Sequence, residues 1–179
     1  MKRVRYYQKS CFCRFLLVVG RPVPYSLLHK LCMAYSGKYK PKNPSKYLGD
    51  PTKITYRSLW ERKCMLLFDD NPNVIRWGSE EICIPYFSPV DRRKHRYYPD
   101  FIVELKNKKG EIETVMIEVK PYKQTQVPPK PKRRTKTFEN AAKTYLVNQA
   151  KWEAAANVCD KKGWRFQILT ERDIYGKGK

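Results

Sequence analysis

The middle of the chain carries two apolar runs that a short polar segment separates. The first run extends from Tyr97 to Leu105, the second extends from Thr114 to Val119, and residues 106–110 between them read KNKKG. A polar cluster closed by a glycine between two such runs predicts a β-hairpin. Both runs are apolar at successive positions, which is typical of strands that are buried on both faces of a sheet.

The turn also predicts the register of this hairpin. The numbers of facing residues in an antiparallel pair add up to a constant, which a turn centred near Lys109 sets at about 218. Asp100 then faces Glu118 to within one residue, and strand alternation places Lys120 on the same face as Glu118. The sequence therefore predicts two carboxylates and one ammonium group close together inside a sheet.

This arrangement calls for a compensating charge. Two like charges at the roughly 5 Å spacing of facing residues repel by about 3 kcal/mol at an effective dielectric constant of about 20. Mg²⁺ or Mn²⁺ would suit the carboxylate oxygens, and no His or Cys flanks the pair. We expect Asp100 and Glu118 to hold a metal ion that activates water, with Lys120 orienting that water or offsetting charge on a phosphate. An ordinary buried ion pair is the alternative, and the spacing alone does not choose between them.

The flanking segments show helical and strand patterns in turn. Apolar residues at helical spacing predict a helix from Ser58 to about Asp69 and a longer helix over residues 138–161. Short apolar runs predict strands at 74–77, 82–86 and 164–170, of which the first two extend the sheet. At 179 residues, the chain has the length of one compact domain.

Several motifs carry a resemblance to known nucleases. Pro99-Asp100 followed by Glu118-Val119-Lys120 resembles the signature of the PD-(D/E)xK nuclease superfamily. The segments YRSLWE, NQAKW and GWRFQILTE at residues 56–61, 148–152 and 163–171 extend the resemblance to the head completion nucleases of T4-like tailed bacteriophages. They are also similar to the endonuclease subunit of certain heteromeric transposases. The resemblance runs from Met33 to the C-terminus.

The resemblance implies both a fold and a set of site residues. The implied fold is a restriction-endonuclease-like α/β core in the order α-β-β-β-α-β, with a mixed central sheet flanked by helices. Glu61 has the spacing to Ser58 of a capping box, in which it would only bond a backbone N–H. The resembled nucleases, however, place an acidic residue on this helix beside the metal. We therefore expect Glu61, Asp100, Glu118 and Lys120 to be catalytic, with Asp100, Glu118 and Glu61 as metal ligands.

The charge of the chain indicates what kind of partner it binds. The formal net charge is +21, and its basic residues are spread over loops among tyrosines, which favours nucleic acid over a membrane surface. Residues 121–136 hold four prolines and no acidic residue and follow Lys120 directly, so we expect an extended loop that clamps the phosphates of double-stranded DNA. A solvated charge run is the alternative. The candidate DNA contacts are Lys130, Lys132, Arg133, Arg134 and Lys136.

The first 53 residues differ from the rest of the chain. Residues 1–32 contain no acidic residue and their apolar run is too short for a signal peptide, so we expect a leader upstream of a natural start at Met33. Residues 33–53 predict a basic extended arm that contacts DNA or lies along the domain. Residues 54–176 would form the nuclease domain. The six cysteines show no metal-ligand spacing, which favours reduced thiols in a cytoplasm.

Taken with the resemblance, these features predict a metal-dependent deoxyribonuclease that acts in phage head completion. The resemblance implies that it processes packaged DNA before head and tail join. Head, portal or neck proteins are the expected protein partners, and the expected location is the host cytoplasm during virion assembly or the virion. The alternative is a non-catalytic DNA-binding head-completion protein whose carboxylates form ion pairs.

Overall fold

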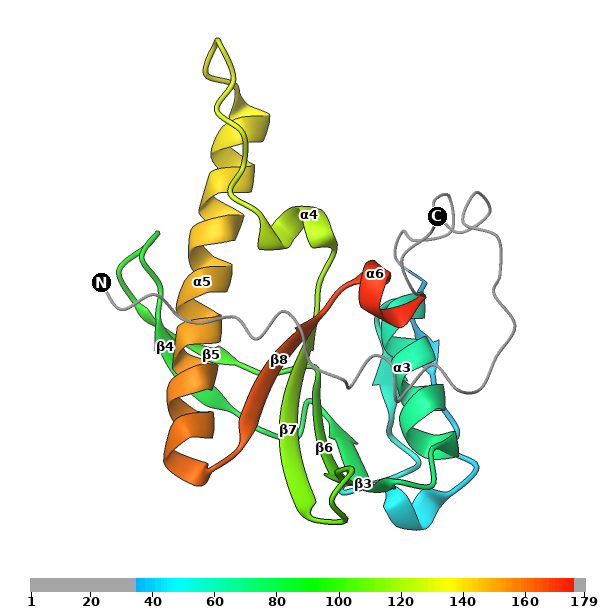
Figure 1. Cartoon of the computed structure of the whole chain (residues 1–179). Helices are drawn as coiled ribbons and strands as arrows, with labels where there is room; N and C mark the ends of the chain where they lie inside the picture. The colour runs from blue at the N-terminus through cyan, green and yellow to red at the C-terminus, as the bar shows by residue number, and fades with distance from the viewer. Residues whose placement is uncertain (1–34, 176–179) are drawn as a thin grey trace.

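The computed structural model describes residues 35–175, which form a mixed α/β fold around one central sheet (Figure 1). The sheet has the order β3-β6-β7-β8, and β8 runs parallel to β7 while the other neighbours are antiparallel. Its strands are β3 (Val74–Ser79), β6 (Phe101–Lys106), β7 (Ile112–Val119) and β8 (Arg165–Leu169). The leader expected over residues 1–32 and the start expected at Met33 lie outside the described residues.

The β6–β7 hairpin has the register that its turn predicts. Phe101 faces Ile117 and Lys106 faces Ile112. The turn closes through the N–H of Asn107, which donates to the carbonyl of Glu111 at 2.8 Å, and Gly110 adopts a φ of 81° that favours glycine. Continuing this register by one residue sets Asp100 opposite Glu118, as the sequence predicts.

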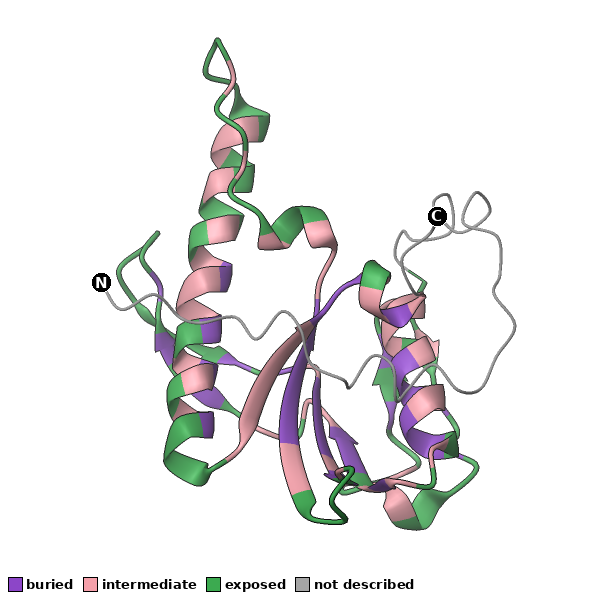
Figure 2. Cartoon of the chain, in the orientation of Figure 1, coloured by how far each residue is buried: buried purple, intermediate pink, exposed green. Residues whose placement is uncertain are grey.

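Helices cover both faces of the sheet (Figures 1 and 2). One face packs against α3 (Leu59–Asp70) and α6 (Glu171–Ile174), where Ile117 lies in a core with Phe68. The opposite face packs against α5 (Lys136–Lys162), where Met116 lies in a core with Ala155. Because both faces are buried, the hairpin strands lack polar alternation. The predicted order α-β-β-β-α-β is confirmed, with two extra strands between β3 and β6.

Those two strands differ from the prediction. β4 (Ile84–Phe87), which was predicted over residues 82–86, does not extend the central sheet but pairs in a separate hairpin with β5 (Lys94–Tyr97), which was not predicted. The edge of β3 that β4 would need is occupied, because the N–H of Leu48 donates to the Trp77 carbonyl at 2.9 Å. The β4–β5 hairpin packs against α5 instead.

The lysine- and tyrosine-rich segment before residue 54 is not an extended arm over its described part. It forms β1 (Gly37–Lys38), which pairs with β2 (Thr55–Tyr56), and a 3-10 turn, η1 (Pro44–Lys46). Buried Asp69 accepts hydrogen bonds from the Tyr39 hydroxyl and from the backbone N–H groups of Lys42 and Asn43. These bonds fasten the segment to the end of α3, so it belongs to the domain.

The segment 121–136 is also more ordered than the prediction of an extended loop. Its first residues form a short helix, α4 (Tyr122–Thr125), and its last residue begins α5, whose N-cap is Thr135. The part between them projects beyond the sheet together with the first turns of α5 (Figure 1). No helix within residues 35–175 is long and apolar enough to cross a membrane.

Candidate active site

Three predicted residues meet where β6 begins and β7 ends. The Lys120 Nζ lies 2.9 Å from Glu118 Oε1 and 3.9 Å from Asp100 Oδ2. The backbone N–H of Val119 donates to Asp100 Oδ2 at 2.6 Å, which holds Asp100 against the neighbouring strand. The Glu118 side chain is only 3% exposed, while those of Asp100 and Lys120 are 18% and 25% exposed. The hairpin therefore gathers the two acids and the amine in a site that solvent reaches from one side.

A fourth residue of this site was missed by the sequence analysis. The Tyr97 hydroxyl donates to Glu118 Oε2 at 2.6 Å, and the Tyr97 side chain is buried. The Lys151 Nζ lies 5.6 Å from the centre of the Tyr97 ring, within the range of a cation–π contact. Tyr97 thus fixes one oxygen of Glu118 and leaves the other facing Lys120. No local pattern points to this role, since β5 and α5 set the orientation of the ring.

Burial and like charge shift the protonation of this cluster. Burial and the negative charge of Glu118 together raise the pKa of Asp100 to about 7, although Lys120 and the Val119 N–H oppose the shift. Burial alone would lower the pKa of Lys120, but the charges of Asp100 and Glu118 and the bond to Glu118 raise it overall. The site therefore holds more negative charge than one ammonium group can neutralise.

Comparisons with known proteins show which family the chain belongs to. The profile of the family described as TnsA-like endonuclease N terminal matches residues 71–171. The head completion nuclease of Enterobacteria phage T4 is 47% identical over 150 residues, which are 82% of this chain and 97% of the T4 protein. The chain belongs to the TnsA-like endonuclease family. This family has the restriction-endonuclease-like fold, and such endonucleases generally use divalent metal ions.

In this member of the TnsA-like endonuclease family, Glu61 does not join the other three residues. Its carboxylate accepts the Arg57 N–H at 2.7 Å and the Ser58 hydroxyl at 2.8 Å, while the Glu61 N–H donates to Ser58 Oγ at 3.1 Å. Its charge contributes to raising the pKa of Asp100, but its oxygens are committed to the start of α3. Within residues 35–175, no three His, Cys, Asp or Glu side chains are arranged to hold a metal. The expectation of Glu61 as a third metal ligand stays a prediction, and it requires the carboxylate to leave its bonds to Arg57 and Ser58.

The remaining atoms of the site fit a hard cation. Lys120 Nζ lies near three oxygens, since it also donates to the Val119 carbonyl at 3.3 Å beside the two carboxylates. The three possible ligand atoms are all oxygens, and two of them belong to carboxylates, a set that suits Mg²⁺ or Mn²⁺. The ammonium group thus lies at the point toward which the oxygens converge, and a divalent ion there would need Lys120 to move aside.

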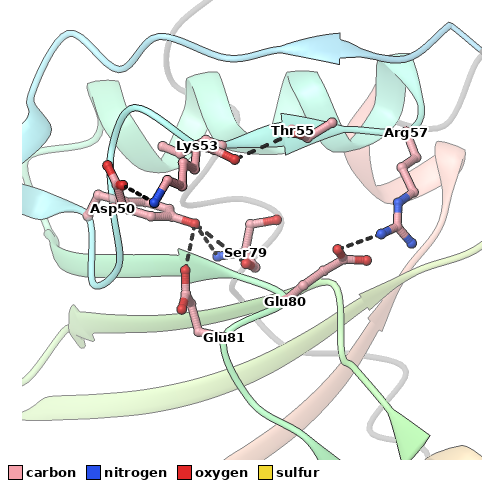
Figure 3. A pocket seen from close by; sticks show the side chains of 9 residues that line it. Asp50, Lys53, Thr55, Arg57, Ser79, Glu80 and Glu81 are labelled. Atoms are coloured by element: carbon pink, nitrogen blue, oxygen red, sulfur yellow. Dashed lines mark hydrogen bonds and ion pairs between the residues drawn. The ribbon is translucent and has the colours of Figure 1, made fainter.

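A second acid-rich feature lies next to this site. A cavity of about 420 Å³ is lined by Tyr47, Asp50, Lys53, Ile54, Thr55, Arg57, Ser79, Glu80 and Glu81 (Figure 3). Each of its carboxylates has a partner, because Lys53 pairs with Asp50, Arg57 with Glu80, and the Tyr47 hydroxyl with Glu81. None of the three residues of the candidate site lines it. The cavity borders the site through the N–H of Glu80, which donates to the Asp100 carbonyl at 3.2 Å.

The predicted DNA contacts lie on the projecting segment. Lys130, Lys132, Arg133, Arg134 and Lys136 are all exposed. Arg134 pairs with Glu139 of α5 at 2.7 Å, so it carries less free charge than its neighbours. The segment starts immediately after Lys120. Its basic side chains can therefore contact only phosphates that lie within the length of this segment from the candidate site.

Proposed function

We propose that this protein is a divalent-metal-dependent deoxyribonuclease that hydrolyses phosphodiester bonds. The observation that carries the proposal is the convergence of Asp100, Glu118 and Lys120 at one end of a buried sheet in a member of an endonuclease family. Burying two acids and an amine in such a place costs folding free energy. Titratable groups that are placed at this cost cluster at functional sites. The high net charge supports a polyanionic substrate.

Each residue has a role that its position allows. Asp100 and Glu118 would hold Mg²⁺ or Mn²⁺ through their carboxylate oxygens, with Tyr97 restraining Glu118. When bound, such an ion supplies Lewis-acid chemistry, which makes water a better nucleophile and offsets charge on the phosphate. Lys120 would leave its present partners to orient the water or to neutralise the phosphate. Water oxygen bonds to phosphorus, one P–O ester bond breaks, and the departing oxygen takes up a proton.

The substrate would be double-stranded DNA held beside the site by the exposed basic residues of the segment 121–136. Lys130, Lys132, Arg133 and Lys136 form no ion pair within the described part of the chain. Cations that are not neutralised internally can contact phosphates and release counterions. Arg134 would have to exchange Glu139 for a phosphate.

The biological setting comes from the T4 protein, which is named a head completion nuclease. We infer that this protein acts at the same stage, processing packaged DNA before head and tail join. Its protein partners would then be head, portal or neck proteins, and its location would be the host cytoplasm during assembly or the virion. The degree of identity and the near-complete coverage of the T4 protein support this assignment.

A plasmid-nicking assay tests the proposed chemistry. The wild type should convert supercoiled DNA to nicked or linear forms with Mg²⁺ or Mn²⁺ and should stop when EDTA is added. Asp100→Ala and Lys120→Ala should lose this activity, while Asp160→Ala, which removes an exposed carboxylate from the end of α5, should keep it. Equal digestion by every variant would indicate a contaminating nuclease. In that case a non-catalytic DNA-binding protein would be the better description.

A further inference from the structure

We propose that one face of the β4–β5 hairpin binds a single-stranded stretch of the DNA substrate next to the bond that is cut. This outer hairpin face is formed by Phe87, Lys94, Arg96 and Tyr98. The proposal rests on the proposed nuclease function and adds a second DNA contact, separate from the segment 121–136, with a preference for unpaired bases.

The two faces of this hairpin differ sharply. The inner face carries Ile84, Tyr86 and Tyr97, which are buried against α5. Phe87 on β4 and Lys94 and Arg96 on β5 point the other way, because side chains alternate along a strand. Tyr98 follows β5 directly and is exposed. The hairpin therefore stands on α5 with one face covered and one face open.

The open face combines large aromatic rings with cations. Phe87 is 59% exposed and Tyr98 is 44% exposed, although both are large hydrophobic residues. Phe87 lies directly across from Lys94 in the β4–β5 register, and Arg96 lies two pairs further along, opposite Pro85. Lys94 and Arg96 are exposed. Exposed rings interleaved with cations are typical of surfaces that bind single strands, since rings stack on bases and cations contact the backbone.

The cations of this face are not neutralised by the protein. Among the described residues, neither Lys94 nor Arg96 forms an ion pair, whereas Arg76 and Arg165 on the central sheet pair with Glu104 and Glu113. The nearest acid on the hairpin, Asp91, is held by His95 at 2.6 Å. The outer hairpin face therefore presents positive charge to a partner. This charge favours a polyanion over a protein surface that has few acidic residues.

The face leads straight to the candidate active site. Tyr97 at the end of β5 bonds to Glu118, and Tyr98 precedes Asp100 by only two residues. Even a fully extended chain would place the Cα of Arg96 at most about 14 Å, and that of Lys94 at most about 22 Å, from the Cα of Asp100. A strand bound on this face would therefore lie within a few nucleotides of the reacting phosphate.

Stacking distinguishes this surface from a general basic patch. Bases inside a duplex are stacked on one another, so Phe87 and Tyr98 can stack only on bases that are unpaired. Lys94 and Arg96 would bind the backbone of either form. The aromatic pair should therefore matter for single-stranded DNA and the basic pair for both.

Binding measurements test this assignment in the full chain. Every protein carries Asp100→Asn so that the DNA stays intact, and fluorescence anisotropy reports binding to a short single strand and to the matching blunt duplex. The aromatic variant is Phe87→Ser with Tyr98→Ser, and the basic variant is Lys94→Gln with Arg96→Gln. Circular dichroism checks that each variant is folded.

The β6–β7 turn offers matched controls at the other end of the central hairpin. Ile112 is 67% exposed and faces Lys106, so this pair has the same kinds of side chain as Phe87 and Lys94. Ile112→Ser serves as the control for loss of an exposed apolar residue. Lys106→Gln with Lys109→Gln removes the same charge as the basic variant.

The expected result separates the two kinds of residue. The aromatic variant should bind the single strand at least about tenfold more weakly, while its duplex affinity changes by less than about twofold. The basic variant should lower the salt slope of single-strand binding by about 1.4. An equal loss for both DNA forms, no loss, or the same loss in the controls would overturn the proposal. If the wild type cannot cut DNA but these differences appear, the proposed nuclease function fails and the binding face stands.

Discussion

Two groups of acids lie side by side in this molecule and behave in opposite ways. The inner acid cluster, Asp100 and Glu118, is largely buried and shares one ammonium group. The outer acid cluster, formed by Asp50, Glu80 and Glu81, lines the open cavity (Figure 3), and each of its members has its own partner. The pKa of Asp100 is raised to about 7, chiefly by burial, whereas hydrogen bonds from Thr52 and Lys53 lower the pKa of Asp50 to about 2.

The comparison shows that the number of carboxylates does not by itself make a site. In the outer acid cluster, water and local partners stabilise each charge, so no cation is needed. In the inner acid cluster, the sheet and α5 exclude most water and two acids compete for Lys120, which leaves a negative charge to be neutralised. Burial without full compensation is therefore the feature that distinguishes the candidate active site, and matched variants of the two clusters can test it.

The largest expected difference is in catalysis. Glu118→Gln should reduce the rate of DNA cleavage by at least about 10²-fold, because it removes a charge on which the site depends. Glu81→Gln makes the same chemical change in the outer acid cluster and should leave the rate within about twofold. Rates of plasmid nicking under saturating Mg²⁺ measure both effects. Similar rates for the two variants would show that the inner acid cluster is not special.

The next largest difference concerns the tyrosines that hold the two clusters. Tyr97→Phe should weaken Mn²⁺ binding by about tenfold to 100-fold, because it frees a carboxylate oxygen that the hydroxyl now orients. Tyr47→Phe removes the equivalent bond to Glu81, which is 2.9 Å long. It should leave Mn²⁺ affinity unchanged. Calorimetry or the electron paramagnetic resonance of Mn²⁺ measures the affinity, and equal weakening by both variants would contradict the role given to Tyr97.

Stability should reveal the raised pKa of Asp100. The folded, metal-free protein keeps a proton on Asp100 between about pH 4 and pH 7 that the unfolded chain releases, so its free energy of unfolding falls as pH rises through that window. Asp100→Asn removes this cost and should stabilise the protein by about 1 to 2 kcal/mol at pH 8, with little gain near pH 4.

Asp50 should contribute to the pH dependence of the free energy of unfolding with the opposite sign, which Asp50→Asn tests. The lowered pKa of Asp50 contributes stability above the pKa of the unfolded state, and this contribution is lost as pH falls toward about 2. The Asn variant should therefore be no more stable than the wild type at pH 8. Urea unfolding at both pH values, with EDTA present, measures the two variants. A destabilised Asp100→Asn protein at pH 8 would contradict the account of the inner acid cluster.

Glu61 should show the smallest effect. Glu61→Gln retains an oxygen that can accept the Arg57 N–H, so we expect cleavage within about threefold of the wild type and little change in stability. Glu61→Ala loses the cap and should cost about 1 kcal/mol of unfolding free energy. A loss of cleavage in Glu61→Gln without a loss of stability would instead show that this carboxylate leaves the cap to serve the reaction.

Much of the candidate site could be predicted because it is local. The turn at residues 106–110 determines the register of β6 and β7, and the register in turn brings Asp100, Glu118 and Lys120 together. The helix signals around Ser58 and over residues 138–161 were confirmed as α3 and α5 because caps and apolar spacing lie within one segment. The bond from Tyr97 to Glu118 could not be predicted in this way, since it joins different strand pairs.

The sequence by itself determined the central hairpin, the helices on either side and the acids that face each other, because short turns, caps and strand alternation act over a few residues. Only the tertiary structure decided where long-range partners lie. It fastened the tyrosine-rich segment to Asp69 and set β4 and β5 on α5 rather than on the central sheet. These outcomes depend on competition between distant groups for the same edge or the same hydrogen bond, and no local pattern contains that competition.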